Sequence, residues 1–265
     1  MEKSKMKAFS AIGAGLLLLG AIFIVALGAN VWFWGDKEIN GNSIEKKKVV
    51  FISKSTDSAF WQSAYTGANA ASAEYNLDLI CKGPDNEEDY QMQNQMIYEA
   101  VKNGADGIIF SAIDFQANAG AINYAKEKGI KIVVVDSPVN SKKTECYIGT
   151  DNYEAGCVAG EEALKNPATN LNIGIVNFDK NTQNGQLRED GFRDTVKKDR
   201  RAKITSSINV RSTVEDAKQG TIDMLKKHPD INVVVTFNEW TSLGVGYGVK
   251  ELGMRDKTQV IAFDS

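Results

Sequence analysis

Polar and aromatic side chains follow short apolar runs of this sequence, at the points where the strands of a parallel sheet would end. The residues in these positions are Ser58, Phe60, Trp61, Ser111, Asp114, Asp136, Asn238 and Asp264. In open parallel sheets, ligands bind just beyond the carboxyl ends of the strands. Carboxylates and amides hydrogen-bond hydroxyl groups, while aromatic rings cover apolar C–H faces. The set therefore predicts a binding site for a hydroxyl-rich ligand in a cleft.

Several of these residues also have a purely structural interpretation. Phe60 and Trp61 begin a predicted helix, where an aromatic pair can belong to the core. Asp114 and Asp136 can serve as caps of the helices that follow them. The residue types alone leave both interpretations open for each of the four.

Two residues of the second part of the chain carry the same ambiguity. Asn238 can be the N-cap of a helix that begins at the next residue. Arg188 lies on a predicted helix, where its neighbours Glu189 and Asp190 allow an ordinary surface ion pair. Spacing does not decide between these interpretations and a role in binding.

Residues for covalent or metal chemistry are scarce. The single histidine, His228, precedes Pro229 at a predicted helix end. The cysteines, Cys81, Cys146 and Cys157, lack the spacing of a metal site. No glycine cluster lies at a strand-to-helix turn, and no Gly-x-Ser-x-Gly nucleophile elbow occurs. We therefore predict no enzyme, no catalytic residue, no cofactor and no metal, and the formal net charge of -3 gives no reason to expect nucleic acid.

Short β-branched runs alternate with amphipathic stretches such as Tyr90–Lys102. The predicted strands are Lys48–Ser53, Leu77–Lys82, Gly107–Phe110, Lys131–Val135, Asn172–Asn177, Ile204–Val210, Val233–Phe237 and Gln259–Phe263. Nearly all-apolar strands separated by helix-length segments indicate right-handed βαβ units and parallel sheets covered on both faces. We predict an α/β fold of two doubly wound parallel-sheet lobes joined by a hinge, with Glu145–Thr150 as the crossing.

The predicted organisation has four parts. Residues 1–35 form a membrane anchor or signal segment, and residues 36–47 form a polar tether. The N-terminal lobe covers residues 48–150, and the C-terminal lobe covers residues 151–265.

The apolar run Phe9–Trp34 is long enough to cross a membrane, at about 39 Å as a helix against about 30 Å for the hydrocarbon core. Lysines precede it and no positive excess follows, so the positive-inside rule predicts one transmembrane helix with a cytoplasmic N-terminus. The alternative is a signal peptide cleaved near Ala26-Leu27-Gly28. Both interpretations place the soluble part outside the cytoplasm, anchored in the cell envelope or secreted.

Longer stretches occur in an order that resembles a known family. They are Gly104–Ile109, Val133–Asp136, Ile148–Gly156, Arg188–Phe192 and Val260–Ser265. In order and spacing they resemble the type I periplasmic sugar-binding proteins, the group that contains ribose-binding protein. The resemblance covers the whole soluble part, from Lys47 to Ser265.

The resemblance implies roles for individual residues. The family's loop motif falls on Ser58-Ala59-Phe60-Trp61, whose aromatic pair would sandwich a sugar ring. Asp136 would accept hydrogen bonds from sugar hydroxyls, and Arg188 would donate two parallel ones. Asn238 and Asp264 match the asparagine and the last-strand aspartate of the family.

The sequence departs from the family at three places. Ser58 replaces the asparagine of the loop motif, and Ser137 replaces an arginine that often follows the fourth-strand aspartate. We therefore do not transfer a particular sugar. The family's last strand and helix return to the first lobe, whereas this sequence stops at Ser265, so we expect a C-terminally truncated chain with an open sheet edge and exposed apolar surface.

The resemblance implies an extracytoplasmic receptor that closes over a monosaccharide or related polyol and feeds an ABC-type permease. The alternative is a sugar-sensing partner of a membrane histidine kinase. LacI-type repressors share this lobe architecture, but they carry a DNA-binding helix-turn-helix where this chain has its apolar run. That difference excludes the repressor interpretation.

Overall fold

The computed structural model describes residues 45–264. The predicted transmembrane helix and most of the tether lie outside the described residues. Within the described range, no helix combines the length and the apolar character that a membrane crossing requires. Lys46–Ser265 forms one compact unit, so the division into lobes at residue 150 stays a prediction.

The first half of this unit is built on a five-stranded parallel sheet with the strand order β2-β1-β3-β4-β5. The strands are β1 (Lys48–Ile52), β2 (Asp78–Lys82), β3 (Gly107–Phe110), β4 (Lys131–Val135) and β5 (Cys146–Ile148). The helices are α2 (Ala59–Glu74), α3 (Tyr90–Lys102) and α4 (Ala119–Glu127). Apolar residues of α3 and α4 pack on one face, and those of α2 pack on the other.

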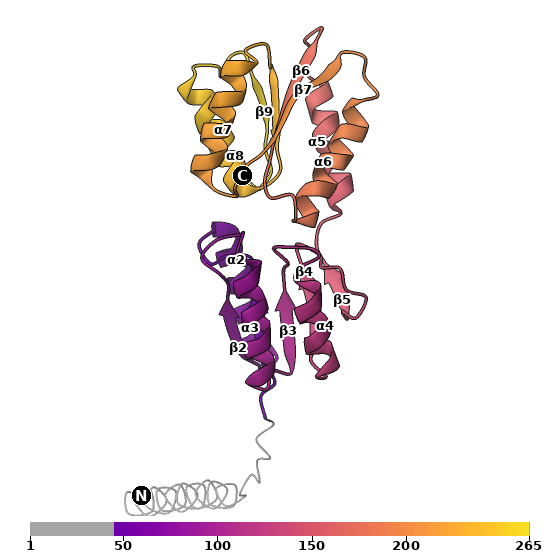
Figure 1. Cartoon of the computed structure of the whole chain (residues 1–265), viewed down its shortest axis with the longest axis vertical. Coiled ribbons are helices and arrows are strands. Elements are labelled where there is room, and N and C mark those ends of the chain that lie inside the picture. The colour runs from indigo at the N-terminus through magenta and orange to yellow at the C-terminus, as the bar shows by residue number, and fades with distance from the viewer. Residues whose placement is uncertain (1–44, 265) are drawn as a thin grey trace, which may run out of the picture. The chain divides into compact units, whose positions relative to one another are not determined.

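The second half contains a four-stranded parallel sheet with the order β7-β6-β8-β9. Its strands are β6 (Leu171–Asn177), β7 (Ala202–Asn209), β8 (Val233–Thr236) and β9 (Gln259–Ile261). Its helices are α5 (Asn152–Leu164), α6 (Gln183–Val196), α7 (Val214–Lys227) and α8 (Glu239–Glu251). Figure 1 shows α5 and α6 on one side of the sheet and α7 and α8 on the other.

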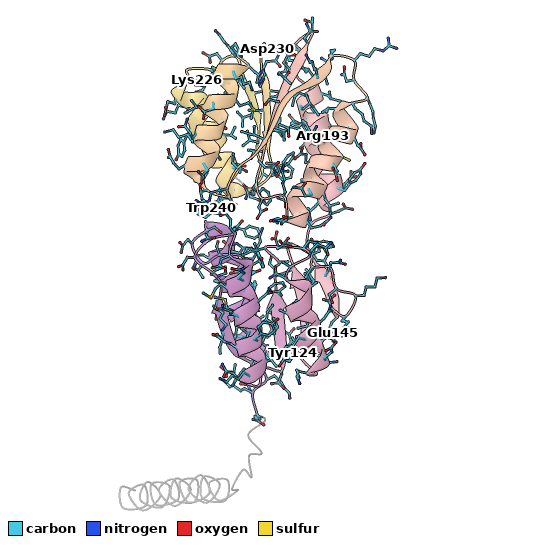
Figure 2. All side chains as sticks on the ribbon, viewed as in Figure 1. Tyr124, Glu145, Arg193, Lys226, Asp230 and Trp240 are labelled. Atoms are coloured by element: carbon cyan, nitrogen blue, oxygen red, sulfur yellow. The ribbon has the colours of Figure 1, made fainter. Side chains whose placement is uncertain are left out.

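Strand β8 shows why the sequence forms such a layer. All four of its residues are buried. Val233 and Val235 face the cluster beneath α5 and α6, whereas Val234 faces the cluster beneath α7 and α8. Successive side chains of a strand point to opposite faces, so a continuous apolar run is required when helices cover both. Charged residues such as Glu145, Lys226 and Asp230 are instead exposed on the outside (Figure 2).

The predicted α/β fold with parallel sheets is confirmed, with corrections at the strand ends. The predicted crossing Glu145–Thr150 contains a fifth strand, β5, whose three residues are all exposed. Its apolar run, Cys146-Tyr147-Ile148, is only three residues long, too short to indicate a strand in the sequence. Strand β7 begins at Ala202 rather than Ile204, and β9 ends at Ile261 rather than Phe263.

Two glycines allow α5 and α6 to approach closely. A Cβ atom at Gly156 would overlap the backbone carbonyl oxygen of Arg188, and one at Gly191 would overlap that of Tyr153. The contact fixes the position of the helix that carries Arg188. It also joins two of the stretches on which the family resemblance rests.

We predict that Gly156→Ala destabilises the protein by about 1–3 kcal/mol, because the added methyl group forces the two helix backbones apart. Thermal unfolding should show a midpoint lowered by about 2–4 °C for each kcal/mol. Gly246→Ala on α8 is the control, since a Cβ there meets no atom within 4 Å. Equal midpoints for the two variants would contradict the close-packing argument.

Candidate ligand-binding site

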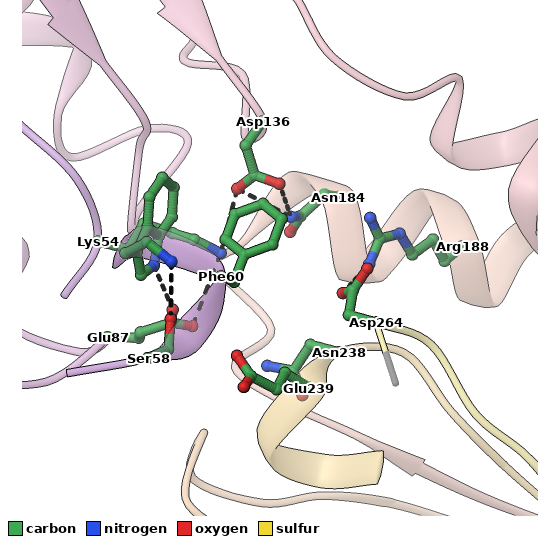
Figure 3. A pocket seen from close by; sticks show the side chains of 11 residues that line it. Lys54, Ser58, Phe60, Glu87, Asp136, Asn184, Arg188, Asn238, Glu239 and Asp264 are labelled. Atoms are coloured by element: carbon green, nitrogen blue, oxygen red, sulfur yellow. Dashed lines mark hydrogen bonds and ion pairs between the residues drawn. The ribbon is translucent and has the colours of Figure 1, made fainter. Parts of the chain in front are cut away.

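A pocket opens where strand ends of both halves meet (Figure 3). The first half contributes Lys54, Ser58, Phe60, Trp61, Glu87 and Asp136 to its lining. The second half contributes Asn184, Arg188, Asn238, Glu239 and Asp264. Seven of the nine residues predicted from the sequence thus line one pocket.

Ser111 and Asp114 are not in this lining. The Asp114 carboxylate accepts hydrogen bonds from the backbone N–H groups of Gln116 and Ala117, both at 2.8 Å, in the turn that leads toward α4. The Ser111 hydroxyl donates to the Asp136 carboxylate at 3.1 Å. Ser111 therefore supports a pocket residue. Asp114 caps the turn before α4 and not the helix itself, whose N-cap is Asn118, so the helix-cap alternative for Asp114 is wrong.

Arg188 is 5% exposed, so its interpretation as a surface ion pair is wrong. Its Nε donates to Asn152 Oδ1 at 2.9 Å, and its Nη1 donates to the carbonyl oxygen of Phe237 at 2.6 Å. The Asp264 carboxylate lies 3.5 Å from Nη1. The guanidinium group is thus held by the backbone and by a neighbouring helix while it faces the pocket.

Asp136 and Asp264 share an uncommon backbone conformation. Their φ angles are +58° and +55°, in the left-handed region that side chains other than glycine rarely adopt. Asp136 directly follows strand β4, and Asp264 lies just after strand β9. Strained residues of this kind concentrate at functional sites, where the surrounding structure holds them in place.

Asp136 connects side chains of both halves rather than capping a helix. Its carboxylate lies 3.6 Å from Lys54 Nζ and 3.4 Å from Asn184 Nδ2. It also accepts the hydrogen bond from Ser111. These partners orient the carboxylate toward the pocket.

The two aromatic residues have different environments. Trp61 is 1% exposed, packs edge-on against Phe51 and donates its indole N–H to Glu87 at 3.0 Å. The core interpretation therefore describes Trp61, although the residue also lines the pocket. Phe60 is 41% exposed and projects into the pocket, with its ring edge-on to that of Trp61 at a centroid distance of 4.9 Å.

Asn238 both caps a helix and lines the pocket, so its structural and its binding interpretation are compatible. It is the N-cap of α8, where its side-chain oxygen accepts from the backbone N–H of Thr241 at 3.0 Å in a capping box. Its side-chain Nδ2 donates to the Ser212 hydroxyl at 2.8 Å. The cap fixes the side chain at the pocket wall.

Sequence reasoning missed four lining residues: Lys54, Glu87, Asn184 and Glu239. Lys54 could have been found, because it follows β1 just as the predicted residues follow their strands. Glu87 lies in the loop after β2, a strand end that the sequence analysis passed over. Glu239 directly follows Asn238, and its Oε2 is buried with no hydrogen-bond partner among the described residues.

The pocket is polar, charged and narrow in this conformation. Two cations, Lys54 and Arg188, face the carboxylates of Glu87, Asp136, Glu239 and Asp264. Its open volume is about 30 Å³, against the roughly 300 Å³ or more of typical small-molecule sites. An adjoining, more apolar groove of about 400 Å³ shares Phe60, Asp136, Arg188 and Asp264 with it. A ligand of sugar size does not fit the narrow pocket alone, whereas the volume of the adjoining groove falls within the range of small-molecule sites.

Residues 45–264 contain no cluster of histidine, cysteine and acidic side chains suited to a metal ion. The charged groups of the pocket instead face one another as donors and acceptors. Such a set can bind hydroxyl groups without a metal or a covalent step.

Asp179, which lies just after β6, has a raised pKa. Burial is the main cause, and the carboxylates of Glu88 and Asp114 add repulsion, while Lys54 and the N–H of Asn181 act in the opposite direction. A carboxyl group with a raised pKa binds its proton more tightly in the folded protein than in the unfolded chain. Its negative charge therefore destabilises the fold at neutral pH.

We predict that Asp179→Asn stabilises the protein at pH 7 by less than about 1 kcal/mol, since solvent screens a half-exposed charge. The gain should shrink as the pH is lowered toward the unfolded pKa of 3.8, because the proton then neutralises the wild-type side chain. Denaturant unfolding at several pH values measures this. Asp256→Asn, at an exposed position, is the control. A gain that does not vary with pH would contradict the charge argument.

Comparison with known proteins gives consistent matches. The model of the periplasmic binding protein domain matches residues 49–265. The D-ribose/D-allose-binding protein of Pseudomonas aeruginosa is 23% identical over 256 residues, which cover 94% of this chain and 79% of that protein.

Solved structures resemble the chain as well. A sugar transporter from Clostridium phytofermentans has a TM-score of 0.76 at 30% identity, covering 81% of this chain and 80% of that one. A chain of the XylFII-LytSN complex has a TM-score of 0.76 at 28% identity, covering 81% of this chain and 78% of that one.

Proposed function

Because the chain belongs to the periplasmic binding protein domain family, we propose that it captures a small sugar between its two halves for ABC-type import. The observation that carries this proposal is the convergence of strand-end side chains from both sheets on one pocket. Relatives named for sugar binding, such as the D-ribose/D-allose-binding protein, support a monosaccharide or a related polyol as the ligand.

The proposed roles follow from the geometry of the pocket. Phe60 covers an apolar face of the sugar ring, because its ring is the exposed member of the aromatic pair. Asp136 and Asp264 accept hydrogen bonds from sugar hydroxyls, while Arg188 and Asn238 donate them. Glu239 supplies a further acceptor through its buried, unpartnered Oε2.

Binding changes the relative population of open and closed forms. A ligand that contacts both halves stabilises the closed form by the free energy of those contacts, and the halves move as hinged bodies. The open form admits the sugar, and the closed form buries it. Nothing in this cycle requires a covalent step, and we propose that the protein is a binding protein and not an enzyme.

The proposed location is outside the cytoplasmic membrane, where a receptor meets its solute before import. The family relationship supports this location. The apolar run at Phe9–Trp34 supports attachment to the membrane by an N-terminal helix.

The test of the proposed function is a thermal-shift screen of the full chain in detergent with pentoses, hexoses and inositols. A sugar at about a hundred times its Kd should raise the unfolding midpoint by roughly 5–10 °C. L-serine, a polar solute without a sugar ring, is the negative control. Unchanged midpoints across the panel, or chemical turnover of a bound sugar, would overturn the proposal.

We predict that Arg188→Ala weakens binding of the selected sugar by about 100-fold, because it removes a buried charged donor. Arg188→Lys should also bind weakly, since the ammonium group keeps the charge but lacks the planar fork. Lys197→Ala, at the end of the same helix with a side chain 66% exposed, is the matched control. Calorimetric titration measures the affinities, and circular dichroism checks folding. An affinity of Arg188→Ala equal to that of the control would remove Arg188 from the site.

Sugar sensing is the second candidate, with the same pocket and a different recipient. It is favoured by the resemblance to a chain of the XylFII-LytSN complex and by the predicted membrane anchor. Deleting the gene separates the two outputs. Loss of labelled-sugar uptake supports import, whereas intact uptake with loss of sugar-induced transcription supports sensing.

A further inference from the structure

Glu87 occupies an unusual position among the pocket residues. It lies in the loop between β2 and α3, and it is only 9% exposed. One of its carboxylate oxygens accepts the indole N–H of Trp61 at 3.0 Å. The other accepts the hydroxyl of Ser212 at 3.1 Å and lies 3.7 Å from Lys54 Nζ. One buried carboxylate thus contacts both halves.

The contact with Ser212 crosses between the halves. Ser212 lies in the loop between β7 and α7, and its oxygen accepts a hydrogen bond from Asn238 Nδ2 at 2.8 Å. A chain of hydrogen bonds therefore runs from Trp61 through Glu87 and Ser212 to Asn238. Its two ends are residues that line the pocket.

Parting of the halves breaks this chain at one bond. The Glu87 carboxylate then exchanges the Ser212 hydroxyl for water, while its contacts with Trp61 and Lys54, which belong to its own half, remain. A change at Glu87 affects the pocket walls in two ways. Glu87 orients the Trp61 indole, which packs against Phe60, and its negative charge neutralises that of Lys54.

We propose that Glu87 is a positioning residue that couples closure of the two halves to the shape of the ligand pocket; this inference rests on the proposed function. It acts through Trp61, Lys54 and Asn238, which form the walls of the pocket. Closure completes the hydrogen bonds of Glu87, and the completed set fixes those walls against the ligand.

The adjacent residue provides a matched control. Glu88 also spans the halves, with both of its carboxylate oxygens 3.1 Å from Arg211 Nε. That pair is solvent-accessible, with side-chain exposures of 33% for Glu88 and 61% for Arg211. Exposed ion pairs contribute little to stability and are screened by salt. Glu88→Gln therefore removes an ion pair between the halves, at a residue that does not line the pocket.

The test uses the full chain with Trp32, Trp34 and Trp240 replaced by phenylalanine, so that Trp61 is the only fluorescent indole among the four tryptophans. Glu87→Gln should raise acrylamide quenching of Trp61 and speed dissociation of D-ribose or D-allose by about tenfold. Glu88→Gln at physiological salt should change neither quantity appreciably. Ser212→Ala approaches the same hydrogen bond from the other half and should reproduce the effect of Glu87→Gln.

The double variant Glu87→Gln/Ser212→Ala decides whether the two residues act together. A coupled pair predicts that the double variant matches Glu87→Gln alone in the quenching of Trp61, which lies in the half that carries Glu87. The proposal would be overturned if the effects of Glu87→Gln and Ser212→Ala on the quenching of Trp61 multiply in the double variant. Equal effects of Glu87→Gln and Glu88→Gln would also overturn it. If neither sugar binds and the panel gives no shift, the proposed function fails, and the quenching values still decide whether Glu87 couples the halves.

Discussion

The buried charge of Arg188 is the constraint on which the second half of the site depends. A guanidinium group in the interior has to be hydrogen-bonded or paired, because an isolated buried charge is very costly. Its partners are Asn152 on α5, the carbonyl oxygen of Phe237 after β8, and Asp264 after β9. Elements distant in the sequence must therefore keep a fixed register. Gly156 permits this register by letting the backbone of α5 reach that of α6.

Lys54 is the buried cation of the first half, as Arg188 is of the second. Its ammonium group lies between the carboxylates of Glu87 and Asp136, at 3.7 and 3.6 Å, and above the ring of Phe178 from the second half. Each half thus holds one buried cation near a strand-end aspartate in the left-handed conformation. Because the cation and the aspartate of each half face the same pocket, a bound hydroxyl group can donate to one and accept from the other.

The parts of the structure that follow from local pattern could be predicted from the sequence. Apolar runs such as Val233–Thr236 locate the strands, and in a parallel sheet the residues after them gather at one edge. Strand β5 was missed because it is short and exposed. Glu87 was missed because only tertiary contacts bury a loop glutamate. Whether Arg188 is buried could not be decided from its neighbours, since its partners lie 36 and 49 residues away along the chain.

The hydrogen bonds that hold the wall side chains differ in length from the contacts among the polar groups that face the pocket. The bonds that hold the walls are of ordinary length, such as Trp61 to Glu87 at 3.0 Å and Arg188 to Asn152 at 2.9 Å. The contacts among the charged and amide groups that face the pocket are longer, with Asn184 to Asp136 at 3.4 Å, Arg188 to Asp264 at 3.5 Å and Lys54 to Glu87 at 3.7 Å. A polar pair at such a distance is weakly bonded, so a small polar group that moves the two atoms apart can bond each of them more closely. Sugar hydroxyl groups both donate and accept, so they can replace these long contacts with shorter ones while the wall bonds remain intact.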